Sequence, residues 1–129
     1  MTKKSKSSAQ WLNDHEKDEY VLRARREGYR SRASYKLLEI DEKFGLLRPG
    51  TVVVDLGAAP GGWTQIAVKK CGPKGSVVGL DLLDIDPLEG AVLIKGDFTE
   101  EKVLDELTAV LEDRTVDLVI SDMAPNLSG

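Results

Sequence analysis

The chain has 129 residues, which fits one domain, and its 41% hydrophobic and 31% charged residues are typical of a globular protein. No apolar run approaches the roughly 20 residues that span a bilayer, and the N-terminus lacks the apolar core of an export signal, so a cytoplasmic protein is expected. The one cysteine, Cys71, excludes an internal disulfide, and the one histidine, His15, argues against Ser-His-Asp catalysis and a metal site.

The net charge of −4 divides unevenly along the chain. Residues 1–36 hold ten Lys and Arg against five Asp and Glu, whereas residues 37–129 hold eight against seventeen. A basic N-terminal part on an acidic body favours contact with a polyanion, although a solubilising tail and a solvated helix face explain these charges equally well. Residues 1–9 have no large apolar side chain besides the initiator and are predicted to form a disordered basic tail.

Two helices are expected within residues 10–45. The first is predicted over 10–27 and ends at Gly28, a residue suited to a helix C-terminus. The second is predicted to be capped by Ser31 and to run to Phe44, because its apolar side chains recur at three- and four-residue spacing. These helices carry much of the positive charge and are the part of the chain expected to face RNA.

Residues 46–129 follow a different pattern, in which short apolar runs alternate with helical segments. Strands are predicted over 51–56, 76–81, 91–95 and 116–121. Helices are predicted over 61–70 and over 99–111, the latter capped by Thr99. This alternation indicates an α/β fold with a parallel sheet. The chain ends eight residues after Ser121, so we expect the fourth strand to have an exposed edge and an uncovered face.

A glycine-rich loop follows the first predicted strand, with the sequence DLGAAPGGW over 55–63. Glycines allow a ligand to approach the backbone closely, and the helix that follows offers free N–H groups at its N-terminus. Asp81 ends the second strand, where an acid accepts hydrogen bonds from both hydroxyls of a ribose. Asp97 follows the third strand, near the expected place of an adenine amino group. The loop therefore predicts a nucleoside-containing cofactor at the carboxyl edge of the sheet.

The loop discriminates among cofactors. The dinucleotide fingerprint needs a glycine where this chain has Ala59, and the Gly-Lys-Ser/Thr of a P-loop is absent. An acid at Asp55 suits a cofactor with a sulfonium and an amino group, which describes S-adenosylmethionine. Two alternatives stay open from the residues alone: a nicotinamide-dependent oxidoreductase, and a tight turn that binds nothing.

Two further features carry candidate chemistry. Asp122 ends the fourth strand beside the cofactor edge, where catalytic side chains of such sheets commonly lie, and this position favours a functional role over the alternative of an Asp that caps the turn before Pro125. The sequence between Arg30 and Lys36 interleaves basic residues with tyrosine, which suits phosphate contacts and base stacking. Taken alone, Lys36 reads as an ordinary surface lysine.

Four motifs occur in a specific order: RSRASYKL over 30–37, DLGAAPGGW over 55–63, DLL over 81–83 and SDMAPN over 121–126. Together they resemble the FtsJ-type ribose 2′-O-methyltransferases, and in particular the bacterial branch that modifies large-subunit ribosomal RNA. The resemblance implies a Rossmann-like, S-adenosylmethionine-dependent methyltransferase fold, of which this chain contains the N-terminal part with about four strands. It also implies methyl transfer to a ribose 2′-hydroxyl without a metal.

The resemblance assigns roles to individual residues. Expected cofactor contacts are Asp55, Gly57, Gly61, Trp63, Asp81, Asp97 and Asp122. Lys36 and Asp122 look like the first two members of a Lys-Asp-Lys-Glu catalytic set, in which a buried Asp122 would keep Lys36 charged. Arg30, Arg32 and Lys36 are the expected RNA contacts.

The same resemblance places the second lysine and the glutamate of the set in later strands. The chain therefore looks like a C-terminally truncated enzyme with half of its catalytic set, for which we expect weak turnover alone. The expected partner is ribosomal RNA, within the large subunit, and the full-length enzyme is expected to be a monomer. The alternative is a non-catalytic RNA- or ribosome-binding module that keeps the cofactor fold.

Overall fold

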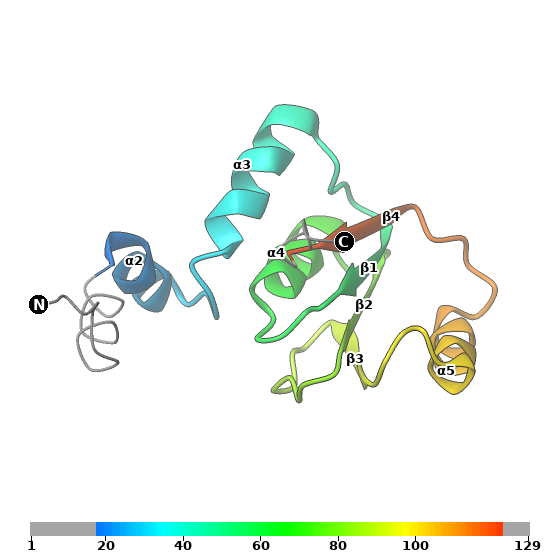
Figure 1. Cartoon of the computed structure of the whole chain (residues 1–129). Helices are drawn as coiled ribbons and strands as arrows, with labels where there is room; N and C mark the ends of the chain where they lie inside the picture. The colour runs from blue at the N-terminus through cyan, green and yellow to red at the C-terminus, as the bar shows by residue number, and fades with distance from the viewer. Residues whose placement is uncertain (1–17, 123–129) are drawn as a thin grey trace, which may run out of the picture.

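The computed structural model describes residues 18–122 and contains one parallel sheet in the order β3-β2-β1-β4 (Figure 1). Its strands are β1 (Val52–Leu56), β2 (Ser76–Asp81), β3 (Ala91–Lys95) and β4 (Leu118–Ser121). Its helices are α2 (Glu19–Glu27), α3 (Ser34–Phe44), α4 (Gly62–Cys71) and α5 (Glu101–Leu111). The predicted α/β class and parallel sheet are confirmed, whereas the tail predicted over 1–9 lies outside the described residues.

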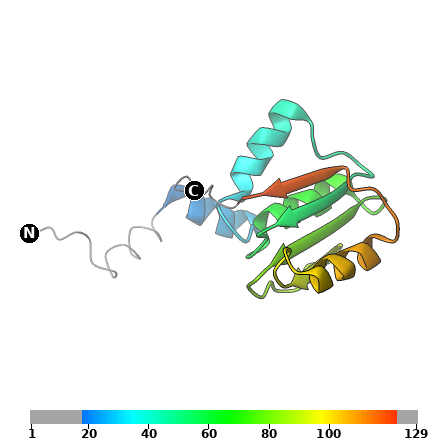
Figure 2. The same cartoon turned by 45° about the vertical axis from the view of Figure 1, so that its right-hand side comes forward.

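Helices cover both faces of the sheet (Figure 2). On one face α3 and α4 pack through Leu37 and Ile66 against Val53 of β1. On the other face α5 packs through Val103 against Val78 and Ile94. Neighbouring residues of a strand point to opposite faces, so the covered centre of a strand is apolar on consecutive positions, as predicted for Val52–Val54 of β1 and for Val77 and Val78 of β2.

Within residues 18–122, helices cover only one face of the fourth strand, as expected. Ile120 is buried beneath α3 and α4, but Val119 on the opposite face is 57% exposed. β4 pairs with β1 alone among the described strands, so its other edge has no strand beside it within residues 18–122.

The start of the first helix differs from the prediction. Asp18 does not belong to the helix expected over 10–27, because its ψ of 128° is not helical and its carboxylate accepts hydrogen bonds from the amides of Tyr20 and Val21. Asp18 therefore caps α2, and residues 10–17 lie outside the described part of the chain. Gly28 ends α2 with φ of 84°, a left-handed conformation that favours glycine, as predicted.

Two predicted helix caps are wrong. Ser31 does not cap α3, which begins at Ser34; its hydroxyl oxygen accepts a hydrogen bond from the amide of Ala33 inside a preceding turn. Thr99 does not cap α5 either, since its hydroxyl donates to Asp97 Oδ1 at 2.6 Å. Both residues satisfy a nearby backbone or carboxylate group instead of a helix end. No helix within residues 18–122 is long and apolar enough to cross a membrane.

Candidate functional site

The strand order creates a site at the carboxyl edge of the sheet. The chain moves outward from β1 to β2 and β3, and then returns to the other side of β1 for β4. This reversal of direction beside β1 is the point at whose carboxyl edge open α/β sheets bind ligands in a crevice. Asp55 of β1 and Asp122 after β4 line one narrow hollow in that crevice, although they are far apart in sequence.

The loop after β1 is held in place by its own backbone amides. Those of Gly57 and Ala58 both donate to the carbonyl oxygen of Leu80 at 2.9 Å. The amide of Ala59 donates to Asp81 Oδ2 at 2.8 Å, so this strand-end acid connects the loop to β2. Gly57 and Gly61 have φ values of 70° and 113°, which strain any other residue. The predicted glycine loop is thus confirmed as a tight, pre-organised turn.

A cavity of about 260 Å³ lies beside this loop. Its walls are mainly apolar, and Leu82 and Phe98 remain 64% and 40% exposed there. Asp81 and Asp97 stand in the same lining, after β2 and β3. An apolar slot with carboxylates at its margin suits a flat heteroaromatic base and the hydroxyls of a ribose. The structure therefore brings Gly57, Asp81 and Asp97 together, as the sequence predicted.

Asp55 is the most unusual acid of the site. It is 1% exposed; its Oδ2 accepts a hydrogen bond from the hydroxyl of Thr64 at 2.7 Å, but its Oδ1 has no partner within the described structure. Burial raises the pKa of Asp55 to about 6, the Thr64 hydrogen bond opposes the rise, and the charges of Asp122 and Asp81 add to it. A buried carboxylate whose Oδ1 has no hydrogen-bond partner can bind a cation or accept a hydrogen bond from a ligand.

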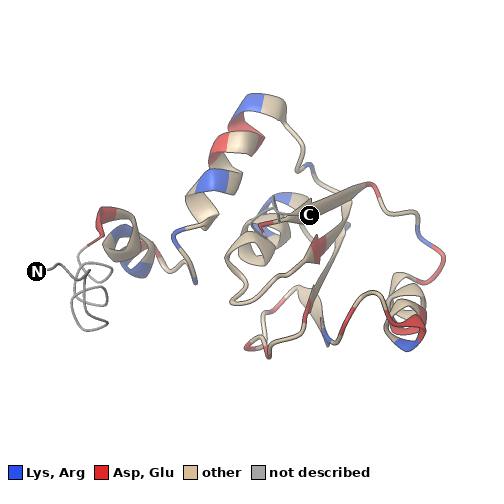
Figure 3. Ribbon diagram, in the orientation of Figure 1, with Lys and Arg blue, Asp and Glu red and all other residues tan. Residues whose placement is uncertain are grey.

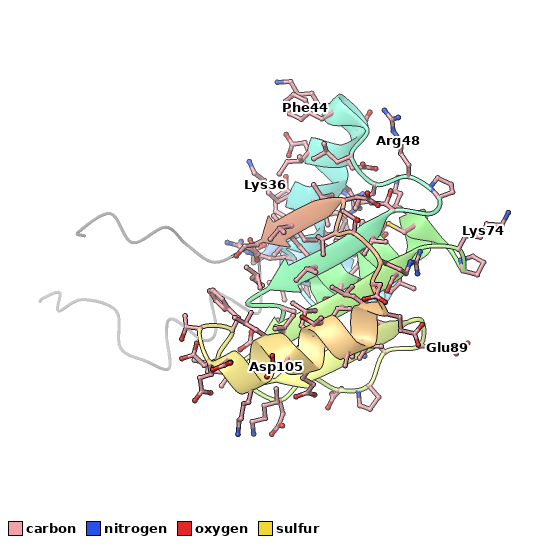
Figure 4. All side chains as sticks on the ribbon, turned by 90° about the vertical axis from the view of Figure 1, so that its right-hand side faces the viewer. Lys36, Phe44, Arg48, Lys74, Glu89 and Asp105 are labelled. Carbon is pink, nitrogen blue, oxygen red and sulfur yellow. The ribbon has the colours of Figure 1, made fainter. Side chains whose placement is uncertain are left out.

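Asp122 stands at the end of β4 on the predicted edge but is exposed, so the expectation of a buried side chain is wrong. Partial desolvation raises the pKa of its carboxyl. Lys36 is also exposed, in the first turn of α3, and forms none of the ion pairs found among residues 18–122. Figure 4 shows the Lys36 side chain extending into solvent near the carboxyl ends of the strands.

The segment between α2 and α3, residues 28–33, is docked on the start of α4. The indole nitrogen of Trp63 donates to the carbonyl oxygen of Ala33 at 2.7 Å, and the ring is buried in the core. Gln65 accepts from the amide of Arg30 at 2.7 Å and donates to the carbonyl of Gly28. A Cβ on Gly62 would lie 2.7 Å from the hydroxyl of Ser34, so this position admits only glycine. The docking places the first turn of α3 beside the glycine-rich loop after β1.

Trp63 therefore has an anchoring role that the sequence did not indicate, and this is testable. Trp63→Ala is expected to lower the free energy of unfolding by about 3 to 5 kcal/mol, because it empties a buried ring site. Trp63→Phe, which keeps most of the packing and loses the hydrogen bond to Ala33, is expected to cost about 1 kcal/mol beyond the smaller ring. Urea unfolding of both variants measures this. A stable Trp63→Ala variant would contradict the anchoring role.

The basic residues of the N-terminal segment surround a second cavity of about 320 Å³. Figure 3 shows Lys and Arg on α2, on the connecting segment and on α3, although α3 also carries acids, and α5 carries mainly acids. This cavity is lined by Arg25, Arg30 and Arg32, together with Pro60 of the glycine-rich loop after β1. Arg32 is ion-paired with Asp18, and Arg30 donates to three carbonyl oxygens within the chain. The basic cavity thus adjoins the crevice that contains Asp122.

A tyrosine cluster, which the sequence analysis did not separate from the basic motif, joins α2 to α3. Tyr35 donates its hydroxyl to Glu27, and the rings of Tyr20 and Tyr29 lie 6.0 and 5.6 Å from its centroid. The guanidinium of Arg23 lies 4.4 Å from the same centroid. Burial, followed by the bond to Glu27, raises the pKa of Tyr35 to about 12. The cluster holds α2 against the start of α3, where Lys36 lies close to the arginines of the connecting segment in sequence.

A family model described as FtsJ-like methyltransferase matches residues 29–129. The chain belongs to the FtsJ-like methyltransferase family. It is 60% identical over 125 residues to the ribosomal RNA large subunit methyltransferase E of Chromohalobacter salexigens. It is 56% identical over 126 residues to the protein of the same name in Chromobacterium violaceum. These matches cover 97% and 98% of this chain but only 60% and 62% of the relatives, so the chain spans about three fifths of their length.

A solved structure agrees with the family assignment. A Plasmodium falciparum protein described as a ribosomal RNA methyltransferase superposes with a TM-score of 0.69 at 30% identity. The match covers 78% of this chain and 60% of that protein. The predicted Rossmann-like methyltransferase fold is therefore confirmed.

Proposed function

We propose that the chain is the cofactor-binding part of an S-adenosylmethionine-dependent methyltransferase that acts on a ribose 2′-hydroxyl of large-subunit ribosomal RNA. The observation that carries the proposal is the unpartnered, buried Oδ1 of Asp55, which lines a hollow beside the adenosine-sized cavity. The family match and the names of the relatives agree with a methyl transfer to ribosomal RNA.

The residues present fit S-adenosylmethionine. Leu82 and Phe98 would enclose the adenine, while Asp81 and Asp97 would accept hydrogen bonds from the ribose hydroxyls and the adenine amino group. Gly57, Gly61 and Trp63 would border the amino-acid portion of the cofactor, and Asp55 would receive a hydrogen bond from its amino group. A cluster of acids also favours a ligand whose sulfonium and ammonium give it net positive charge. When bound, the cofactor supplies an activated methyl group.

A pyrophosphate fits poorly, which argues against a nicotinamide cofactor. The Ala59 amide is already used by Asp81, and Asp55 and Asp122 place negative charge where phosphates would lie. Calorimetry on this chain is expected to show binding of S-adenosylmethionine and none of NAD. Tight NAD binding without S-adenosylmethionine binding would refute the proposal.

Lys36 and Asp122 are the residues of this chain that we place at the reacting hydroxyl. Lys36, exposed on the first turn of α3, would hold the ribose oxygen by hydrogen bonding. Asp122 would orient Lys36 and the bound cofactor. The hydroxyl is a weak nucleophile at neutral pH, so its proton must be removed by a positioned amine. In the family pattern that amine is a lysine from a later strand. Alignment of the ribose oxygen with the methyl carbon contributes much of the remaining rate acceleration.

The RNA is proposed to contact the basic surface formed by α2, the connecting segment and the start of α3. Arg32 would bind a phosphate while Lys36 contacts the target ribose, and the cavity beside Pro60 leads from this surface to the crevice with Asp122. We place this activity in the cytoplasm, on RNA within the large ribosomal subunit. Transfer of a tritiated methyl group to ribosomal particles tests it, and a full-length protein that binds the cofactor without labelling RNA would support the non-catalytic binding module instead.

A further inference from the structure

The Arg30 side chain makes three hydrogen bonds to backbone carbonyl oxygens that are distant in sequence. Its Nη1 donates to the carbonyl oxygen of Pro60 at 3.2 Å and to that of Asp86 at 2.6 Å. Its Nη2 donates to the carbonyl oxygen of Pro87 at 2.7 Å. Its backbone amide is fixed separately by Gln65 at the start of α4. All four partners lie at least 30 residues away in sequence, so Arg30 joins three separate parts of the chain.

These partners lie on the two loops that border the cofactor crevice. Pro60 belongs to the glycine loop after β1, and Asp86 and Pro87 belong to the loop after β2, a few residues beyond Asp81. A Cβ on Gly61 would meet Arg30 Nη1 at 3.0 Å, so the glycine loop is in close contact with the guanidinium as well as bonded to it. The position of Arg30 therefore couples the conformations of both loops.

The geometry points to Arg30 as a positioning residue for the cofactor site, rather than a ligand of an RNA phosphate. Arginine suits this task because its planar fork presents several donors in fixed directions, whereas a lysine ammonium presents one compact group. The three carbonyl oxygens are uncharged, so they do not neutralise the guanidinium. The Arg30 side chain is therefore fixed by directional hydrogen bonds and not by an ion pair. The inference rests on the proposed cofactor function for its effect on binding.

The direction of the change in cofactor affinity distinguishes a positioning role of Arg30 from a purely electrostatic one. S-adenosylmethionine carries net positive charge, so removing a nearby positive charge should by itself strengthen its binding. Arg30→Gln is instead expected to weaken binding about tenfold or more, because the two loops lose their shared contact. Arg30→Lys, which keeps the charge but not the fork, is expected to lie between the wild type and Arg30→Gln. Arg26→Gln, on exposed α2, is the matched control for loss of an arginine charge.

Hydrogen exchange provides a readout that does not depend on any cofactor. The amide of Ala59 is bonded to Asp81, and the amide of Ala91 is bonded to the carbonyl of Leu88, so each reports on one of the two loops. Both amides are expected to exchange about tenfold faster in Arg30→Gln than in wild type, and unchanged in Arg26→Gln. If the wild type fails to bind S-adenosylmethionine, the proposed function is wrong, but exchange at these two amides still decides the role of Arg30.

The experiment uses the full chain, calorimetry with S-adenosylmethionine, and binding of a ribosomal RNA fragment, with circular dichroism to confirm folding. The inference is supported when Arg30→Gln weakens cofactor binding and speeds exchange at Ala59 and Ala91, while RNA affinity falls no further than in Arg26→Gln. It is overturned when cofactor affinity and exchange stay at wild-type values, or when only RNA affinity falls. Should Arg30→Gln not fold, the same criteria apply to Arg30→Lys.

Discussion

Lys36→Ala is expected to lower the rate of methyl transfer at least about 100-fold in the full-length protein, because it removes the group that we place on the attacking ribose oxygen. Lys36 is exposed and forms none of the ion pairs found within residues 18–122, so its loss should leave the fold intact. Asp122→Asn, which keeps the shape of the side chain and removes its charge, is expected to have a similarly large effect. The rate is measured with saturating S-adenosylmethionine and ribosomal particles as acceptor.

Lys43→Ala supplies the matched control, because Lys43 is an exposed lysine near the opposite end of α3. Its rate should equal that of the wild type. Calorimetry on the same variants should give Lys36→Ala an unchanged affinity for S-adenosylmethionine, which would assign its defect to the acceptor side of the reaction. Full activity in both Lys36→Ala and Asp122→Asn would refute the proposed catalytic roles.

Asp55→Asn is expected to stabilise the cofactor-free protein while weakening its binding of S-adenosylmethionine. The folded state raises the pKa of Asp55 from its ordinary value of 3.8 to about 6, chiefly through burial. The contribution of Asp55 to the free energy of unfolding is therefore fully present below about pH 4. It is lost as the pH rises through 6, where the buried carboxyl ionises. Asparagine avoids that loss, with a gain of up to about 3 kcal/mol at pH 8. Urea unfolding at pH 5 and pH 8 measures the difference.

Cofactor binding should have the opposite pH dependence. A cationic ligand favours the ionised carboxylate, so binding must be weaker below the pKa of about 6, where Asp55 is neutral. Between pH 7 and pH 5 we expect the affinity of the wild type for S-adenosylmethionine to fall about tenfold. Asp55→Asn should bind weakly with little dependence on pH. Equal affinities of wild type and variant across this range would exclude Asp55 as a ligand of the cofactor.

Much of the fold could be predicted from the sequence, because its signals are local. Runs of consecutive β-branched residues gave β1 and β2 to within one residue, since a strand buried on both faces is mainly apolar, with Asp55 near the end of β1 as the buried exception. The glycine loop could also be placed, because Gly57 and Gly61 adopt backbone angles that other residues avoid. The helix starts were predicted less well, since Ser31 and Thr99 each bond to a near neighbour, and which partner a short polar side chain selects depends on the folded turn.

The sequence by itself determined the order of the elements, the kind of loop and the acids at the strand ends. Only the tertiary structure decided which of these meet. Insertion of β1 between β2 and β4 brings Asp122 to the same hollow as Asp55, and burial there changes the pKa of Asp55. The three carbonyls around Arg30 are invisible in a sequence, because every residue has a carbonyl and only folding selects which ones converge. Local pattern thus specified the parts, and long-range packing specified what each part contacts.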